Sequence, residues 1–276
     1  GAITRSHTFH FSYLHTPVRY AWDFSKVYQA SLKPRWLIDL VWPIFMHYLR
    51  IWDIAAVNRV DHYTCNARNV ARRIKKIYDR DSEVIYPPVD TDRFTIGDQR
   101  EGYFFILAAL VPYKRVDLAV KACVELGVPL KLAGVGPEES NLRELAGSGN
   151  VEFLGRVGHE EAVELYQKAT GFLFPGEEDF GITPLEAQAC GTPVIAYARG
   201  GALETVIDKK TGVYFSEQTV ESMKAAIKKC QDMAFDRSTL RSHALTFDNN
   251  CFRKRFSDSV CTSYQNYLNL MDNAGL

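Results

Sequence analysis

The sequence lacks a surplus of charge of either sign, cysteine pairs and a long apolar run. Its 276 residues carry 33 Lys and Arg against 33 Asp and Glu, so no overall field attracts nucleic acid. Six cysteines are scattered without C-x-x-C spacing, which indicates reduced, mostly buried thiols in a cytoplasmic protein. We expect no secretory signal, and the apolar stretch 36–49 is interrupted by Asp39, Pro43 and His47, so it is not expected to span a membrane. Any anion-binding site must therefore be local.

Metal-binding and nucleophile motifs are also missing. The seven histidines show no metal-ligand spacing, and no Ser/His/Asp or Cys/His order stands out. Hydrophobic residues make up 46% of the chain, which is ordinary globular composition and excludes a disordered protein. The sequence thus predicts a folded globular protein, and its histidines and cysteines offer no recognisable metal-ligand motif.

The first ninety residues predict a domain of their own. Aromatic residues alternate over 9–15, which is typical of a strand, and apolar residues recur at helical spacing through 37–78, with a second helix at 69–78. A short strand at 84–86 precedes Pro87 and Pro88. Two consecutive prolines continue neither a helix nor a sheet ladder, so we place the joint between domains there, with domains at 1–90 and 91–245 and a C-terminal helix within 246–276.

Regular alternation of strands and helices follows the prolines. Short apolar runs predict buried strands, and the segments between them have helical spacing. The expected strands are 103–107, 130–133, 151–154, 171–174, 193–196 and 212–215. Such alternation predicts an α/β fold with a doubly wound parallel sheet, whose ligands bind beyond the carboxyl ends of the strands.

The strongest local signal is the segment 177–186, Glu-Glu-Asp-Phe-Gly-Ile-Thr-Pro-Leu-Glu. Gly181 permits close approach of the backbone to a ligand, and a helix beginning near Pro184 offers free N–H groups. Glu178 in the loop and Glu186 one turn into the helix can face one cleft, where carboxylates accept hydrogen bonds from sugar hydroxyls. The alternative is an acidic loop that caps its own helix.

Three weaker signals accompany it. Lys114 and Arg115 follow a predicted strand and precede a helix, which makes a local anion site or an exposed surface pair. Gly200 and Gly201 open another helix and could hold a phosphate on backbone amides, although any tight turn uses such glycines. His15 ends its strand beside aromatic residues, where a histidine is more often structural.

Together these segments resemble glycosyltransferase family 4, and more closely its mannosyltransferases of bacterial O-antigen and polysaccharide assembly. The matching stretches are 13–23, 67–90, 110–117, 153–157 and 174–206, the last reading FPGEEDFGITPLEAQACGTPVIAYARGGALETV. The resemblance implies a GT-B fold: a complete Rossmann-like donor-binding domain, a partial Rossmann-like acceptor domain at the N-terminus, and a C-terminal helix that returns to the first domain.

The resemblance assigns roles to individual residues. Glu178 matches the glutamate placed against the donor sugar, beside the backbone amides of Phe180, Gly181, Ile182 and Thr183. Glu186 matches the residue that holds the ribose hydroxyls. Lys114 matches the lysine that neutralises the donor diphosphate, with Gly200 and Gly201 on the phosphate side. The backbone at Gly155 lies where the base is read, and His15 matches the histidine that points at the reacting sugar.

The implied activity is retaining transfer of a hexose, without a metal or other cofactor, to a glycan or lipid-linked acceptor. GDP-mannose is the favoured donor on the resemblance to mannosyltransferases, and a UDP-sugar is the alternative. Retention by front-face attack needs no enzymic nucleophile. We expect a cytoplasmic protein. Two further hypotheses remain: a nucleotide-sugar-binding subunit that needs a partner for activity, and another GT-B enzyme such as a phosphorylase or epimerase.

Two features depart from the family pattern. Ala108-Ala109 stand where many members have Gly-Arg, so Arg115 is the candidate replacement for a phosphate-binding arginine. The early part of the acceptor domain is not in the sequence, which implies an excised piece or a shortened enzyme that self-associates or takes a partner chain. The segment from Lys33 to Leu49 either docks peripherally at the inner face of a membrane or packs inside the first domain.

Overall fold

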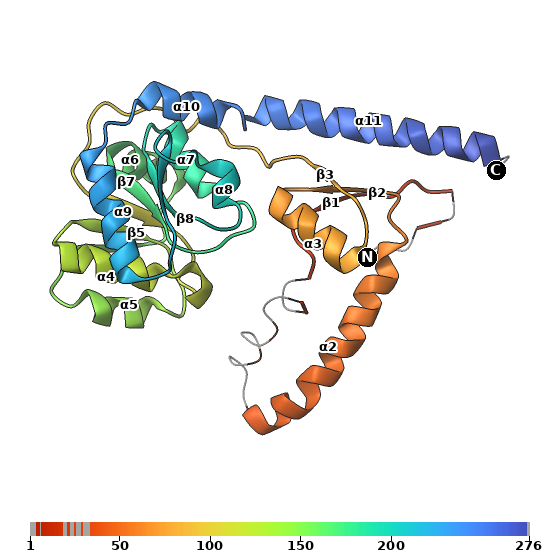
Figure 1. Ribbon diagram of the computed structural model, residues 1–276, viewed down its shortest axis with the longest axis horizontal. Helices are drawn as coiled ribbons and strands as arrows, with labels where there is room; N and C mark the ends of the chain where they lie inside the picture. The colour runs from red at the N-terminus through yellow and green to blue at the C-terminus, as the bar shows by residue number, and fades with distance from the viewer. Residues whose placement is uncertain are drawn as a thin grey trace. The chain divides into compact units, whose positions relative to one another are not determined.

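The chain forms two compact units in the computed structural model, which describes residues 4–5, 7–18, 21–22, 25, 29 and 34–274 (Figure 1). Unit 1 comprises residues 1–86 and 253–276, and unit 2 comprises residues 87–252. The joint therefore falls after Tyr86 rather than after residue 90, because Val89 N–H donates to the Phe247 carbonyl at 2.8 Å and Thr91 Oγ1 to Asp248 Oδ2 at 2.6 Å. These bonds join the residues after the double proline to unit 2.

Unit 2 is built on a sheet of six parallel strands in the order β6-β5-β4-β7-β8-β9. The strands are β4 (Phe104–Leu107), β5 (Leu130–Ala133), β6 (Val151–Gly155), β7 (Gly171–Phe174), β8 (Val194–Tyr197) and β9 (Gly212–Phe215). The chain builds outward from β4 to β6, then crosses to β7 and builds in the other direction. The predicted doubly wound α/β fold is confirmed, and β4 and β7 form its topological switch point.

The helices of unit 2 fall into two groups by their contacts. One group contains α4 (Val116–Leu126), α5 (Glu139–Ala146) and α9 (Val220–Asp232), and the other contains α6 (His159–Lys168), α7 (Thr183–Ala189) and α10 (Arg237–Leu245). The first group packs on the strands through buried side chains such as Phe104, Leu118, Leu130, Leu142 and Ile227. Helices α9 and α10, which the sequence analysis did not specify, complete one layer each.

Unit 1 contains a smaller parallel sheet in the order β1-β2-β3, with β1 at Phe11–Leu14, β2 at His62–Cys65 and β3 at Glu83–Val84. The expectation of helix throughout 37–78 is wrong, because β2 separates α2 (Arg35–Val57) from α3 (Arg68–Tyr78). Tyr63, Thr64 and Cys65 are buried, and their strand pairs with β1 on one side and β3 on the other. A four-residue strand between two longer helical patterns is too short to show a period of its own.

Helix α2 is mostly exposed, although Asp53 near its end is buried. The Asp53 carboxylate accepts hydrogen bonds from Trp22 Nε1 and from the Tyr78 hydroxyl, each at 2.9 Å. Among the described residues, α2 is a helix whose length and composition would allow it to cross a membrane. Core helices of soluble proteins and signal sequences have the same length and composition. The prediction that 36–49 does not span a membrane therefore stays a prediction.

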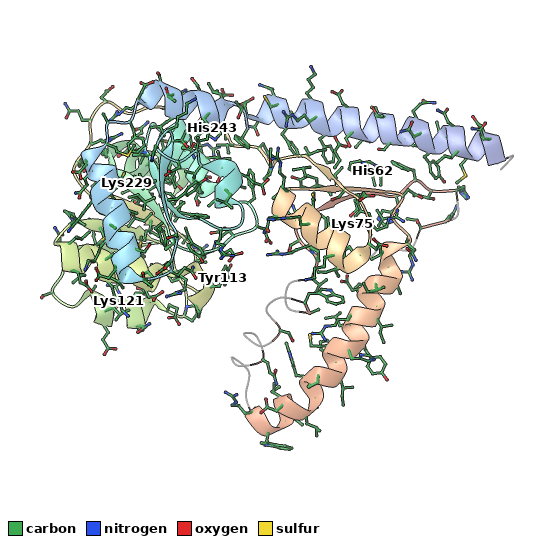
Figure 2. All side chains as sticks on the ribbon, in the orientation of Figure 1. His62, Lys75, Tyr113, Lys121, Lys229 and His243 are labelled. Atoms are coloured by element: carbon green, nitrogen blue, oxygen red, sulfur yellow. The ribbon has the colours of Figure 1, made fainter. Side chains whose placement is uncertain are left out.

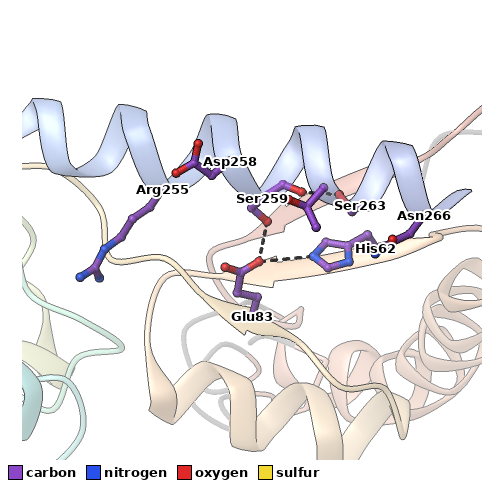
Figure 3. Close-up of a pocket in the computed structure, with 8 residues that line it drawn as sticks. His62, Glu83, Arg255, Asp258, Ser259, Ser263 and Asn266 are labelled. Atoms are coloured by element: carbon purple, nitrogen blue, oxygen red, sulfur yellow. Dashed lines mark hydrogen bonds and ion pairs between the residues drawn. The ribbon is translucent and has the colours of Figure 1, made fainter.

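The C-terminal helix α11 (Asn249–Ala274) packs on the small sheet from residue 253 onward. Phe256 contacts Phe11 with ring centroids 5.4 Å apart, and Tyr264 lies 5.6 Å from Phe9. A pocket of about 340 Å³ lies between this helix and the sheet. Figure 3 shows that its polar groups bond to one another, since Ser259 donates to Glu83 at 2.5 Å and Glu83 lies 3.6 Å from His62. None of the predicted site residues lines it, and we interpret it as part of the bracing of unit 1.

Candidate functional site

The predicted cation and carboxylate meet at the switch point of the large sheet. Lys114 ends a short 3-10 helix (Pro112–Lys114) that follows β4, and Glu178 lies in the loop that follows β7. Their side chains form a direct ion pair, and they are 17% and 21% exposed, so the pair is accessible from solvent at one side. Gly176 makes this approach possible, because a Cβ there would lie 2.9 Å from Lys114 Cα. An anion could bind to the Lys114 ammonium here, and a neighbouring hydroxyl-rich group could donate hydrogen bonds to the Glu178 carboxylate.

Arg115 lies next to this pair but is directed elsewhere. Its backbone has φ 51°, and its guanidinium contacts the Asp117 carboxylate, with Nε 3.2 Å from Oδ1. Arg115 Nη1 also lies 3.5 Å from Gln218 Oε1, while Gln218 Nε2 donates to the Pro175 carbonyl at 3.0 Å. The proposed phosphate role of Arg115 thus requires competition with Asp117. Gln218, which was not predicted, joins the loops after β4, β7 and β9.

Glu186 lies in the first turn of α7 and is largely buried. Its Oε2 accepts a hydrogen bond from the Tyr166 hydroxyl at 2.9 Å. Burial raises the pKa of the Glu186 carboxyl above its ordinary value, and the hydrogen bond from Tyr166 opposes that rise. Tyr166 was also missed by the sequence analysis. The available signal was a tyrosine on the apolar side of α6, since a buried hydroxyl needs a partner.

The glycine pair holds two loops against each other. Gly201 N–H donates to the Glu178 carbonyl at 2.8 Å, and a Cβ on Gly201 would lie 2.2 Å from the Phe180 carbonyl oxygen. Gly200 has φ 61°, and a Cβ there would meet the Glu178 carbonyl oxygen at 2.3 Å. The predicted phosphate-side loop therefore packs directly on the predicted sugar-side loop, and the Phe180 side chain is buried.

The remaining predicted residues of unit 2 lie at the end of β6 or after the end of β7. Gly181, with φ 86°, packs on the Phe174 ring and precedes the exposed Ile182, and Thr183 begins α7 without a side-chain cap. Gly155 ends β6 with φ 66°, and a Cβ added there would meet no atom within 4 Å.

His15 belongs to unit 1. It is exposed, and its ring contacts Tyr13 edge-on at 5.3 Å. In the described part of the chain, no group of three His, Cys, Asp or Glu side chains is arranged to hold a metal ion. Figure 2 labels Tyr113, which marks the position of Lys114 because its ring lies 5.5 Å from the Lys114 ammonium.

Known structures share this architecture. The Anabaena protein HepE, in complex with UDP and glucose, superposes with a TM-score of 0.71 at 17% identity, over 91% of this chain and 71% of that one. Sucrose-phosphate synthase from Thermosynechococcus elongatus has a TM-score of 0.70 at 19% identity, over 93% and 68%. At these identities the likeness shows the fold alone.

Curated relatives and a family model point the same way. D-inositol 3-phosphate glycosyltransferase from Mycobacteroides abscessus is 30% identical over 237 residues, which are 75% of this chain and 52% of that protein. The same enzyme from Mycobacterium bovis BCG is 32% identical over 62% of this chain and 41% of its own length. The chain thus spans about half the length of these relatives. The model for glycosyl transferases group 1 matches residues 89–242, which is more than half of the chain. The chain belongs to the group 1 glycosyl transferase family.

Proposed function

We propose that this chain carries the donor-binding half of a retaining, metal-independent glycosyltransferase, which moves a hexose from a nucleotide sugar to a glycan or lipid-linked glycan. The observation that carries the proposal is the Lys114–Glu178 ion pair at the switch point of the sheet, with Glu186 nearby in the first turn of α7. A cation for the diphosphate lies beside a carboxylate for sugar hydroxyls, and a second carboxylate is available for the ribose.

The chemistry follows from the charges that develop during transfer. The bond from the anomeric carbon to the diphosphate oxygen breaks, and a bond to an acceptor hydroxyl forms as that hydroxyl loses its proton. Negative charge grows on the departing diphosphate, so a prearranged ammonium such as Lys114 stabilises the transition state more than the ground state. No side chain is assigned as nucleophile, and the proposed contact of His15 with the reacting sugar belongs to the acceptor side.

For the donor we propose GDP-mannose, on the motif resemblance to mannosyltransferases, with a UDP-sugar as the alternative. Two observations bear on this choice. Structural neighbours include proteins in complex with UDP, and the curated relatives named above are glycosyltransferases that act on D-inositol 3-phosphate. We propose that backbone atoms at Gly155 contact the base of the nucleotide. Because such contacts do not depend on the side chains, the side chains carry little information about which base is bound.

Calorimetric titration of the chain with GDP, UDP and ADP, followed by GDP-mannose, tests the donor site. With EDTA present, we expect saturable binding of one nucleotide, and we expect Glu186→Ala to weaken that binding by about 100-fold, since a buried carboxylate that receives charged hydrogen bonds is removed. Loss of binding in EDTA would overturn metal independence. Absence of binding by any of the three nucleotides would overturn the donor site itself.

The second candidate is a nucleotide-sugar-binding subunit that is inactive alone. Transfer assays separate the two: binding without turnover, followed by turnover when a partner polypeptide is added, would establish the subunit and refute an enzyme active by itself.

The protein is further proposed to lie in the cytoplasm, with unit 1 in peripheral contact with the inner face of a membrane. By sequence, unit 1 carries 16 basic and 9 acidic residues, a net charge of +7, whereas unit 2 carries 17 and 24, a net charge of −7. Helix α2 exposes large apolar side chains that include Trp36 (73%), Leu40 (63%) and Tyr48 (67%). The adjoining helix α3 carries Arg68, Arg72, Arg73, Lys75 and Lys76. Apolar and basic groups together favour an anionic bilayer as the occupant.

Vesicle sedimentation tests this contact. We expect binding to vesicles that contain phosphatidylglycerol but not to pure phosphatidylcholine, and we expect the Trp36→Ser, Leu40→Ser double variant to bind about tenfold more weakly because less apolar area enters the bilayer. Leu203→Ser in unit 2, a side chain that is 52% exposed, is the matched control. Self-association in lipid-free solution that the double variant abolishes would instead assign the face to a second copy of the chain.

A further inference from the structure

Tyr166 is a buried tyrosine whose hydroxyl donates a hydrogen bond to Glu186, a residue of the candidate site. It lies near the end of α6 and is fully buried among aromatic rings, with Phe105 at 5.1 Å, Phe172 at 5.3 Å and Phe94 at 5.9 Å between centroids. Its backbone carbonyl is fixed as well, because it accepts a hydrogen bond from Thr192 Oγ1 at 2.5 Å. The packing around this ring therefore determines where the hydroxyl points.

We infer that Tyr166 is a positioning residue for nucleotide binding, whose hydroxyl holds Oε2 of Glu186 so that Oε1 is left to accept hydrogen bonds from the ribose of the donor nucleotide. The inference rests on the proposed function, since it gives Glu186 a ribose partner. The contact that carries it is the 2.9 Å bond from the Tyr166 hydroxyl to Glu186 Oε2. A carboxylate oriented in advance loses less side-chain entropy when it binds its ligand.

The same bond acts on the charge of Glu186. Burial raises the pKa of the Glu186 carboxyl, and the Tyr166 hydroxyl opposes this because it donates to the ionised form. The Cys190 thiol also interacts electrostatically with the Glu186 carboxylate and with the Arg241 guanidinium. Burial raises the pKa of Cys190 to about 12, so the thiol stays neutral in the range of the experiment. The hydroxyl thus keeps the carboxylate ionised, and able to accept two hydrogen bonds, at lower pH than burial alone would allow.

Tyr166→Phe removes the hydroxyl and keeps the ring. The matched control is Tyr103→Phe, because Tyr103 is also buried and its hydroxyl donates to the Leu165 carbonyl at 2.9 Å, beside Tyr166 in the same helix. Both variants lose one buried hydrogen bond near α6, but only the first changes Glu186. Calorimetry would compare the two variants and the wild type with GDP or UDP, whichever binds, and with its 2′,3′-dideoxy analogue, across pH.

We expect Tyr166→Phe to weaken binding of the ribonucleotide by about tenfold, the usual effect of a lost hydrogen bond to a charged group. Affinity for the dideoxy analogue should match that of Tyr103→Phe, since that ligand cannot use Glu186. The acidic limb of the ribonucleotide binding profile should also move to higher pH in Tyr166→Phe alone, because the pKa of Glu186 rises.

Equal losses for both ligands, or an unmoved acidic limb, would show a merely structural tyrosine and overturn the inference while leaving the donor site intact. If the wild type bound neither nucleotide, the proposed function would be overturned, and the ribose role of Glu186 with it. The two results are distinguished by the wild-type titration alone.

Discussion

Replacing Lys114 by alanine is expected to lower the rate of sugar transfer by about 10²–10³-fold, the effect of removing one prearranged group that stabilises developing charge. The ammonium lies at the carboxyl end of β4 and pairs with Glu178 across the switch point. Its removal takes the positive charge from the diphosphate side and leaves the Glu178 carboxylate without its partner. Donor turnover and nucleotide affinity, measured on the same protein, check this.

Two control variants distinguish the effect of a positive charge at the site from that of a positive charge elsewhere on the protein. Lys114→Arg keeps the cation and should retain part of the activity, whereas Lys229→Ala removes an exposed cation on α9 and should change nothing (Figure 2). A nucleoside without phosphates should bind Lys114→Ala as well as the wild type. If Lys114→Ala turned over the donor at the wild-type rate, the assignment of the site would be wrong.

Gly201→Ala is expected to have the largest effect on folding. The backbone of Gly201 is in the ordinary helical region, with φ −67°, so conformation does not require glycine there. Glycine is required there by the lack of space, because an added Cβ would lie 2.2 Å from the Phe180 carbonyl oxygen and 2.3 Å from Phe180 Cα. These are backbone atoms, so the two loops must separate. We expect the free energy of unfolding of unit 2 to fall by about 3 kcal/mol.

The measurement must follow unit 2 and not unit 1. All four tryptophans of the chain, Trp22, Trp36, Trp42 and Trp52, lie in unit 1, so their fluorescence reports on that unit. Far-ultraviolet circular dichroism reports on the helices of both units, so urea unfolding should be followed by this signal and by tryptophan fluorescence together. The difference between the two transitions then isolates unit 2, and nucleotide affinity is measured in parallel. Gly158→Ala is the control, since its Cβ would meet no atom within 4 Å and should cost less than about 1 kcal/mol. An unchanged unfolding midpoint for Gly201→Ala would refute the close packing of these loops.

Much of unit 2 could be predicted from the sequence for a physical reason. Its central strands β4, β7 and β8 are buried on both faces, so they appear as short continuous apolar runs such as 104–107 or 171–174 between turn residues. Lys114, Glu178 and the glycine turn at 200–201 follow such runs directly. Because parallel strands end at one edge of the sheet, the order of strands and loops alone places these residues on the same edge.

Other features depended on partners far away in the sequence. Strand β2 has no pattern of its own and exists because it pairs with β1 on one side and β3 on the other. Arg115 has the side chain of a typical phosphate ligand, yet its guanidinium is held by hydrogen bonds to Asp117 and Gln218.

The sequence by itself determined the doubly wound fold, the family and the loops that carry the candidate site, because local apolar periodicity and short motifs encode them. Only the tertiary structure decided that Lys114 meets Glu178, that Gly201 presses on Phe180 and that Tyr166 holds Glu186. These contacts join residues 20 or more positions apart, and the direction of each side chain is set by what the folded core packs around it.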